Sequence, residues 1–177
     1  MIRNEIDILE GVEIIKDGKR FIVKGKKGQI EKEFFHPDIQ IKIEDKKIII
    51  TSEIERKKIK ALIGTWDSLL KNMMLGVTKG WQAEVTAVYQ HFPIKLKIEK
   101  NKLHIENFLG EKHPRTVLLP EDVEVKVEKN CIIISGVDKE KVGQVAALIE
   151  QKTKVKGYDR RVFQDGCYIT KKPYLVE

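Results

Sequence analysis

The sequence predicts an α+β fold of two tandem, duplicated domains, each an antiparallel β-sheet with one amphipathic helix packed on a face. Two observations support this fold class. Apolar and polar residues alternate along several short segments, as they do in half-buried strands, and the same order of segments occurs twice within the 177 residues. The expected domains are residues 1–80 and 81–177, and each is of a size that folds around one core.

The internal repeat is visible in the positions of the apolar residues. Four of them in "VEIIKDGKRFIV", from Val12, recur 82 positions on in "IKLKIEKNKLHI", from Ile94. Five more in "IQIKIEDKKIIITS", from Ile39, recur 84 positions on in "VEVKVEKNCIIISG", from Val123. Because a small loop insertion leaves such a difference between the two spacings, we infer a duplicated unit.

Each unit carries one helical pattern after its second hairpin. In the first unit, Ser52 and Glu55 form the pattern of a capping box. Apolar residues then recur every three or four positions, and the helix is expected to end at Gly76. In the second unit, Asp138 is the expected N-cap and the helix is expected to end near Lys154. Both helices therefore present one apolar face to a sheet.

Four dipeptides mark the expected turns and strand starts. Asp17-Gly18 and Lys100-Asn101 are placed at the tips of corresponding hairpins, and Asp-Gly accepts the positive φ angles of a tight turn. Gly80-Trp81 and Gly157-Tyr158 follow the two helices. Each unit is thus expected to leave its helix through a glycine and to resume extended structure at the aromatic residue.

The charge of the chain favours a polyanionic partner. Lys and Arg outnumber Asp and Glu by 34 to 27, which gives a net charge of +7 at pH 7. Of this charge, +4 lies in residues 151–177, where seven basic residues occur with three acidic ones. Tyrosines and a phenylalanine stand among these cations. Such a mixture suits RNA, because cations neutralise phosphates while rings stack on exposed bases.

Several classes of function find no support in the sequence. The four histidines and two cysteines, Cys131 and Cys167, show no zinc-binding or disulfide spacing. No phosphate-binding loop, nucleophile motif or pair of carboxylates stands out, so no metal, cofactor or catalytic residue is expected. No segment approaches the ~20 apolar residues of a membrane span. We therefore expect a soluble protein of the reducing cytoplasm, without a membrane partner.

Two segments have a composition that is unusual for a protein surface without a ligand. In "NFLGEKHPRTV", a rigid proline beside Arg115 is placed to fix the guanidinium for bidentate contact with phosphate, and a solvated loop fits the same residues about as well. In "RRVFQDGCYIT", a C-terminal hairpin is expected to turn at Asp165-Gly166, with Val162, Cys167 or Ile169 buried. The alternative for this hairpin is a solvated face without a ligand.

At these segments the sequence resembles a known family. The duplicated unit, "NFLGEKHPR" and above all "RRVFQDGCYI" are similar to the large-subunit ribosomal protein L-six family, in its archaeal and eukaryotic branch. The resemblance covers essentially the full chain. One departure is Cys167, which stands where this branch usually has an aliphatic residue. This change is expected to affect packing more than RNA contact.

The resemblance implies a structural constituent of the cytoplasmic large ribosomal subunit rather than an enzyme. Such a protein binds large-subunit rRNA near the stalk base and the sarcin-ricin loop, mainly through its C-terminal domain. Its implied partners are neighbouring ribosomal proteins at the stalk base, with translational GTPases docking nearby. Asp165 and Gly166 are expected to shape a turn. The residues expected to bind rRNA, on this resemblance and on local charge, are Lys112, Arg115, Lys156, Tyr158, Arg160, Arg161, Phe163, Gln164, Lys171 and Lys172.

Three other functions stay open at the level of the sequence. A stand-alone RNA-binding regulator would share every feature above and differ only in its partner. An enzyme would need a pocket with perturbed acids or bases. A protein-interaction module is the third possibility, for the first domain, whose acidic start and mixed surface are less typical of RNA binding.

Overall fold

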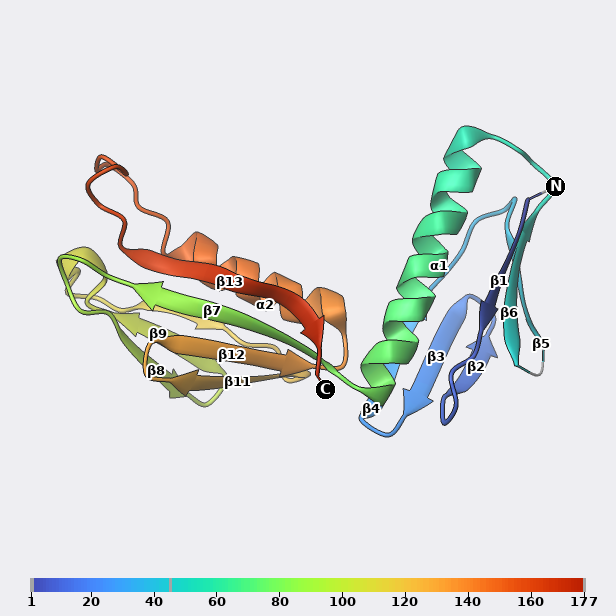
Figure 1. Ribbon diagram of the computed structural model, residues 1–177, viewed down its shortest axis with the longest axis horizontal. Helices are drawn as coiled ribbons and strands as arrows, with labels where there is room; N and C mark the ends of the chain where they lie inside the picture. Colours follow the sequence, from blue (N-terminus) through green and yellow to red (C-terminus); the bar gives the residue numbers. More distant parts are fainter. Residues whose placement is uncertain (1, 45, 177) are drawn as a thin grey trace. The chain divides into compact units, whose positions relative to one another are not determined.

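The computed structural model describes residues 2–44 and 46–176 and confirms the α+β fold class (Figure 1). The chain divides into two compact units, residues 1–80 and residues 81–177, here called unit 1 and unit 2. Within the described residues, each unit contains two antiparallel sheets and one α-helix. The sequence predicted one sheet for each helix, so the second sheet in each unit adds to the expected architecture.

Unit 1 places three strands in each of its two sheets. One sheet has the order β1-β6-β5 and the other β2-β3-β4, and neighbouring strands in both are antiparallel. The helix α1 packs against β3, β1 and β4. The elements are β1 (Ile2–Asp7), β2 (Glu13–Asp17), β3 (Arg20–Gly25), β4 (Gly28–Glu33), β5 (Gln40–Glu44), β6 (Lys47–Ser52) and α1 (Lys57–Thr78).

Aromatic residues form the centre of the unit 1 core. The ring of Phe34 makes edge contacts with Phe21 and with Trp66, at centroid distances of 5.4 and 5.6 Å. All three side chains are buried, and such edge-to-face pairs stabilise a core beyond the area they bury. Trp66 therefore joins α1 to the sheet β2-β3-β4 through Phe34.

The boundaries of α1 differ from the sequence prediction. Ser52 ends β6 instead of capping the helix, and its hydroxyl accepts a hydrogen bond from the Ile54 N–H at 3.2 Å. The helix begins at Lys57, without a side-chain cap at Arg56. It also passes through Gly76 to Thr78, because its apolar face continues to the fully buried Val77. Burial of this last turn outweighs the weak helix preference of glycine.

The two predicted hairpin tips have different outcomes. Lys100 and Asn101 form the turn between β8 and β9, as predicted, and Lys100 has a φ of +52°. In the first unit, Asp17 pairs with Arg20 in the strand ladder. The turn is therefore Gly18 and Lys19, one residue later than predicted, with a φ of +58° at Gly18.

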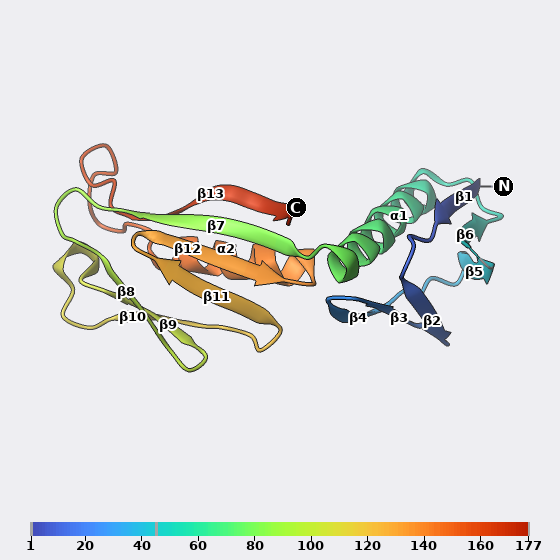
Figure 2. The same cartoon turned by 60° about the horizontal axis from the view of Figure 1, so that its bottom comes forward.

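Unit 2 has one sheet of four strands, β11-β12-β7-β13, and one of three, β10-β9-β8 (Figure 2). All strand pairs are antiparallel. A 3₁₀ turn, η1 (Phe108–Gly110), precedes β10. The other elements are β7 (Trp81–Val88), β8 (Lys95–Glu99), β9 (Lys102–Glu106), β10 (Arg115–Leu118), β11 (Val123–Glu128), β12 (Cys131–Gly136), α2 (Lys139–Lys152) and β13 (Gly166–Leu175).

The helix α2 covers the four-stranded sheet, packing against β13, β7 and β12. Its N-cap is Asp138, as predicted, and the side chain accepts a hydrogen bond from the Glu140 N–H at 2.9 Å. The helix ends at Lys152, close to the predicted Lys154. The predicted apolar face is buried, and it consists of Val142, Val145, Ala146 and Ile149.

The predicted C-terminal hairpin is wrong. Residues 160–164 form no strand, and β13 begins at Gly166 and pairs along β7 instead. Tyr158 likewise lies in a loop and starts no strand, unlike Trp81 at the start of β7. The reason is that one side of β7 pairs with β12, and β13 takes up the backbone hydrogen bonds of the other side.

Replacing Asp138 by Ala is expected to lower the free energy of unfolding of unit 2 by about 1 kcal/mol, because the Glu140 N–H loses its acceptor. Asp138→Asn is the matched control, since an amide oxygen caps a helix about equally well. Amide hydrogen exchange should become faster along α2 in the Ala variant, with α1 as internal reference. Equal exchange along α2 in both variants would contradict this role of the cap.

Candidate nucleic-acid interface

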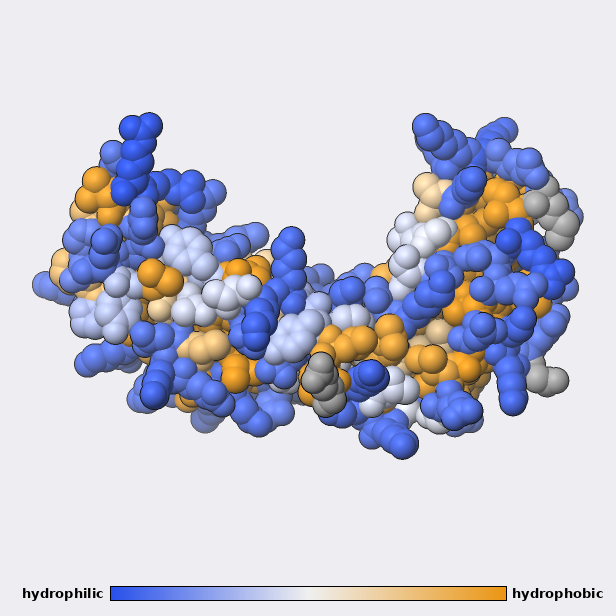
Figure 3. Space-filling model, viewed as in Figure 1, coloured by the Kyte–Doolittle hydropathy of each residue, from blue (hydrophilic) through white to orange (hydrophobic). Residues whose placement is uncertain are grey.

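Most of the predicted RNA-binding residues lie in the segment between α2 and β13, residues 153–165, here called the basic loop. The side chains of Lys154, Lys156, Tyr158, Arg160 and Arg161 are all exposed. Figure 3 shows strongly hydrophilic side chains projecting from this loop, at the upper left, beside apolar ones. The loop thus offers positive charge and aromatic surface together, the composition expected of an RNA contact.

Three loops of unit 2 lie together at one end of the unit, the left end in Figures 1 and 2. The loop after β7 is joined to the basic loop by hydrogen bonds from His91 and Phe92 to Asp165. Arg115, the first residue of β10, donates a hydrogen bond to the carbonyl of Lys152 at the end of α2 and also pairs with Glu111 in the loop before β10. Residues far apart in the sequence therefore form one surface.

Asp165 anchors the basic loop and has a different role from the one predicted. Its side chain is fully buried, and Oδ2 accepts hydrogen bonds from the backbone N–H groups of His91 (3.3 Å) and Phe92 (3.5 Å). Oδ1 lies 3.2 Å from Nδ1 of His91. The predicted hairpin turn at Asp165-Gly166 does not exist, and Asp165 instead holds the loop that follows β7.

The hydrogen bonds keep the Asp165 carboxyl ionised. Burial raises its pKa, but the bonds from the His91 side chain and from the backbone N–H groups of residues 90–92 lower it further, so the pKa lies below its ordinary value. An ionised carboxylate only accepts hydrogen bonds. We therefore assign the Nδ1 proton to His91, which donates to Asp165.

A column of three aromatic rings also supports the basic loop, and it begins at His91. The His91 ring stacks on Phe163, with centroids 4.6 Å apart and planes 26° apart, and Phe163 contacts Tyr158 at 4.7 Å. Phe163 is half-buried between the other two rings. Tyr158 is 53% exposed, so part of its ring is open to a ligand.

Hydrogen bonds between residues close in sequence hold the backbone at the tip of the basic loop. The carboxylate of Asp159 accepts from the Arg161 N–H at 2.9 Å, and its backbone carbonyl accepts from the N–H groups of Val162 and Phe163. The hydroxyl of Tyr168, on β13, donates to the carbonyl of Gln164 at 3.0 Å. The backbone that carries the two arginines is therefore ordered before any ligand arrives.

The predicted cations divide into paired and unpaired side chains. Arg115 donates to both carboxylate oxygens of Glu111, at 2.9 and 2.6 Å, and its guanidinium lies 4.2 Å from the centroid of the Phe108 ring. This pairing lowers the pKa of Glu111. Lys171 donates to Glu84 at 2.9 Å. The carboxylate of Glu111 thus takes the place where a bidentate phosphate was expected at Arg115, and the binding of Arg115 and Lys171 to rRNA stays a prediction.

The other five predicted cations, and Lys154 of the basic loop, are unpaired. In the part of the chain that the structure describes, they form no hydrogen bond and no ion pair, so their charge is available to a ligand. Each one is exposed to solvent. They are Lys112, Lys154, Lys156, Arg160, Arg161 and Lys172.

Thr153 and His91 are structural residues of this region that the sequence did not reveal. The Thr153 hydroxyl is buried, accepts a hydrogen bond from the Cys167 N–H at 2.8 Å and lies 3.3 Å from the carbonyl of Ile149. It therefore joins the end of α2 to β13. Gly166 allows this approach, since a Cβ there would lie 3.1 Å from the Thr153 carbonyl oxygen. No short motif marks either residue in the sequence.

The two cysteines of unit 2 are the remaining candidates for a reactive group. Cys167 is buried, and burial raises the pKa of its thiol to about 11, so it is neutral at physiological pH. Cys167 and Cys131 are both free thiols. Within residues 2–44 and 46–176, no group of three His, Cys, Asp or Glu side chains is arranged to hold a metal ion, and no helix is long and apolar enough to cross a membrane.

A duplicated α+β fold with unpaired cations on an anchored loop defines a class of nucleic-acid-binding protein, and comparison with known proteins identifies its family. The Ribosomal protein L6 family model matches residues 8–80 and 92–166. The chain therefore belongs to the Ribosomal protein L6 family, whose members are structural components of the ribosome rather than enzymes. The two matched ranges also confirm the internal duplication.

Curated relatives match along nearly the whole chain. The Large ribosomal subunit protein uL6 of Methanosarcina mazei is 45% identical over 171 residues, which cover 97% of each chain. The protein of the same name from Methanothrix thermoacetophila is 47% identical over 94% of this chain and 95% of its own. The protein of the same name from Methanococcus vannielii is 44% identical over 97% of this chain and 94% of its own. The resemblance found in the sequence is thereby confirmed.

Replacing Asp165 by Ala is expected to lower the free energy of unfolding of unit 2 by about 2–3 kcal/mol at pH 7, because buried N–H groups lose their acceptor. The folded pKa of Asp165 is lowered, so its stabilisation is present above about pH 4 and is lost as the pH falls through the folded pKa. The difference between wild type and variant should therefore shrink at pH 3. Urea denaturation followed by Trp81 fluorescence, in a Trp66→Phe background, measures this difference.

Asp159→Ala is the control for Asp165→Ala. Asp159 is an exposed acid of the same loop, with its carboxylate bonded to the Arg161 N–H. Asp159→Ala should lower the free energy of unfolding of unit 2 by less than about 1 kcal/mol. A loss for Asp165→Ala that is the same at pH 7 and pH 3 would contradict the role of the ionised carboxylate.

Proposed function

We propose that the chain is a structural constituent of the cytoplasmic large ribosomal subunit and binds large-subunit rRNA mainly through unit 2. The curated relatives are named large ribosomal subunit proteins, and their identity of 44–47% along nearly the whole chain supports the same assembly here. The observation that carries the proposal is the set of unpaired cations on the anchored basic loop. Unpaired lysines and arginines exchange counterions for phosphates, which drives binding to RNA.

The mechanism is rigid presentation of these cations. Asp165, the ring column and the Tyr168 hydroxyl fix the backbone of the basic loop. Because this order exists in the free protein, little conformational entropy is lost on binding. Phosphate contacts from Lys154, Lys156, Arg160 and Arg161 position the protein on folded RNA, and the exposed face of Tyr158 packs on a base or a ribose.

A more specific location is also proposed. The family resemblance implies a site near the stalk base and the sarcin-ricin loop, where translational GTPases dock beside neighbouring ribosomal proteins. The expected contribution, which the family resemblance implies, is architectural. The protein would hold rRNA elements in the arrangement that elongation factors need.

Replacing Arg160 and Arg161 together by Ala is expected to weaken binding to large-subunit rRNA by roughly tenfold or more at physiological salt. The slope of log affinity against log salt should fall by about 2, since each lost phosphate contact removes about 1. The measurement is a salt series with an rRNA fragment that contains the sarcin-ricin loop and the stalk base. An unrelated RNA of equal length tests specificity.

Lys97→Ala with Lys126→Ala is the matched control for net charge. These two lysines lie on strands of unit 2 and are paired with Glu99 and Glu124. The control removes the same number of charges as the arginine variant. Because these lysines lie outside the basic loop and are already paired, the salt slope of the control should change much less. Unchanged affinity and slope in the Arg160/Arg161 variant would refute the role of the basic loop. Equal binding of wild type to both RNAs would refute the proposed location.

A further inference from the structure

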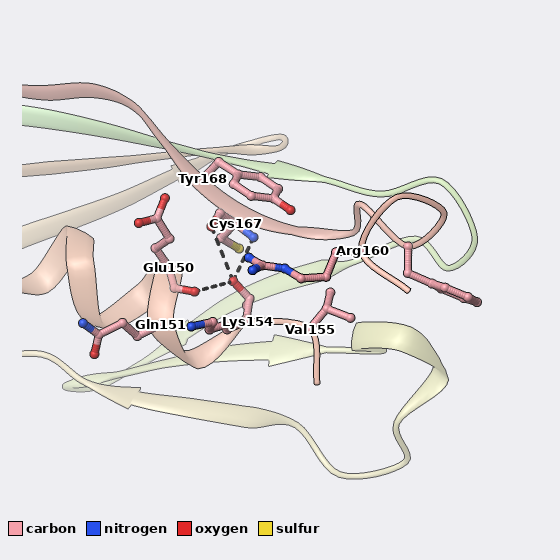
Figure 4. A pocket seen from close by; sticks show the side chains of 9 residues that line it. Glu150, Gln151, Lys154, Val155, Arg160, Cys167 and Tyr168 are labelled. Carbon is pink, nitrogen blue, oxygen red and sulfur yellow. Dashed lines mark hydrogen bonds between the residues drawn. The ribbon is translucent and has the colours of Figure 1, made fainter. Parts of the chain in front are cut away.

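A groove runs beside the basic loop, between the end of α2 and β13 (Figure 4). Its volume is about 650 Å³, within the range of pockets that hold small organic ligands. Residues from three segments line it, among them Glu150 on α2, Lys154 and Arg160 in the loop, and Tyr168 on β13. The groove is therefore built from the same elements that carry the unpaired cations.

The floor of the groove is rigid. The hydroxyl of Thr153 accepts a hydrogen bond from the Cys167 N–H at 2.8 Å, and this bond joins the residue that follows α2 to β13. Cys167 and Val155 are buried at the base of the groove. The Cys167 thiol is neutral because burial raises its pKa to about 11. A ligand would thus meet a preformed, uncharged surface at the bottom.

The walls present two planar groups. The Tyr168 ring is 42% exposed, and its hydroxyl is held by the carbonyl of Gln164 at 3.0 Å. The Arg160 side chain extends into the groove (Figure 4), and within the described residues its guanidinium has no hydrogen-bond or ion-pair partner. An aromatic ring is a protein group on which unstacked bases of RNA stack, and a guanidinium without a partner beside it is placed to bind a phosphate of the same strand.

One side of the groove accepts hydrogen bonds. Glu150 Oε1 accepts from the Ile169 N–H at 3.1 Å, whereas Oε2 has no partner among the described residues. The carbonyl groups at the end of α2 add negative potential there. A carboxylate beside carbonyls disfavours a phosphate but accepts hydrogen bonds from the amino or imino groups of a base. The groove therefore suits a base, with the phosphates outside it on Lys154 and Lys156.

We propose that this groove holds one unstacked nucleobase of the bound RNA, with Tyr168 as the stacking group and Glu150 as acceptor for an N–H group of the base, while Arg160 keeps its contact with the phosphate backbone. The inference rests on the proposed rRNA binding and adds a single-nucleotide site to it. Recognition at this site reads one base, whereas the outer cations read only the phosphate backbone.

Tyr168→Ala is expected to weaken binding to the rRNA fragment by roughly 5- to 150-fold, the range for loss of one stacked base. The salt slope should stay unchanged because no phosphate contact is lost. Tyr168→Phe separates stacking from loop anchoring, since it keeps the ring and removes the hydroxyl that binds Gln164. Near wild-type affinity of Tyr168→Phe supports stacking. An equal loss in both variants would overturn it, because the hydroxyl alone would then account for the effect.

Glu150→Gln tests the acceptor through the sign of its effect. The amide oxygen of Gln keeps an acceptor for the Ile169 N–H, so the groove should remain folded. Loss of a negative charge by itself strengthens RNA binding. A hydrogen bond that a base N–H donates to Glu150 predicts weaker binding of Glu150→Gln instead, by roughly threefold or more. Tighter binding of Glu150→Gln would overturn the assignment of Glu150.

Ultraviolet crosslinking of the wild-type complex, followed by mass spectrometry, distinguishes failure of this site from failure of the proposed function. A single nucleotide attached to Tyr168 is the expected result. Specific, salt-dependent binding with no adduct at Tyr168 and no effect of Tyr168→Ala would refute the nucleobase site alone. Absence of specific binding by the wild type would refute the proposed rRNA binding itself.

Discussion

The buried carboxylate of Asp165 is the interaction on which the candidate RNA surface depends. It accepts hydrogen bonds from two backbone N–H groups and pairs with His91, so it ties the basic loop to the loop after β7. Burying a carboxylate is costly unless hydrogen bonds compensate for lost hydration. Because these bonds form only when both loops are in place, one group determines the positions of both. The stack of His91 on Phe163 reinforces the same junction.

Pairing within the protein decides which cations a ligand can use. Arg115 has a carboxylate and a carbonyl as partners and serves to hold the loop before β10 against the end of α2. Lys171 is similarly paired with Glu84. Arg160 and Arg161 have no such partners in the described chain. A count of net charge does not distinguish them from Arg115 and Lys171, because each of the four contributes +1. The availability of a charge is thus a property of its surroundings.

The two units show how a duplicated fold acquires a specialised surface. In unit 1 the sheet β5-β6-β1 has three strands, and the corresponding sheet of unit 2, β11-β12-β7, has the additional strand β13 along β7. The basic loop is the connection from α2 to this added strand. The predicted RNA contacts therefore concentrate on the part of unit 2 that has no counterpart among the described residues of unit 1. The common core of strands and helix serves as the scaffold.

The sequence by itself determined the fold class, the duplication, the buried faces of both helices and the Asp138 cap. These features follow from local periodicity and from residue types that act on near neighbours. Only the tertiary structure decided that β13 pairs with β7, that Asp165 binds the loop at residues 90–92, and that Arg115 is paired while Arg160 is not. Each of these depends on groups that meet only after folding, between segments far apart in the chain or across a folded loop. Such contacts cannot be predicted directly from residue type and spacing.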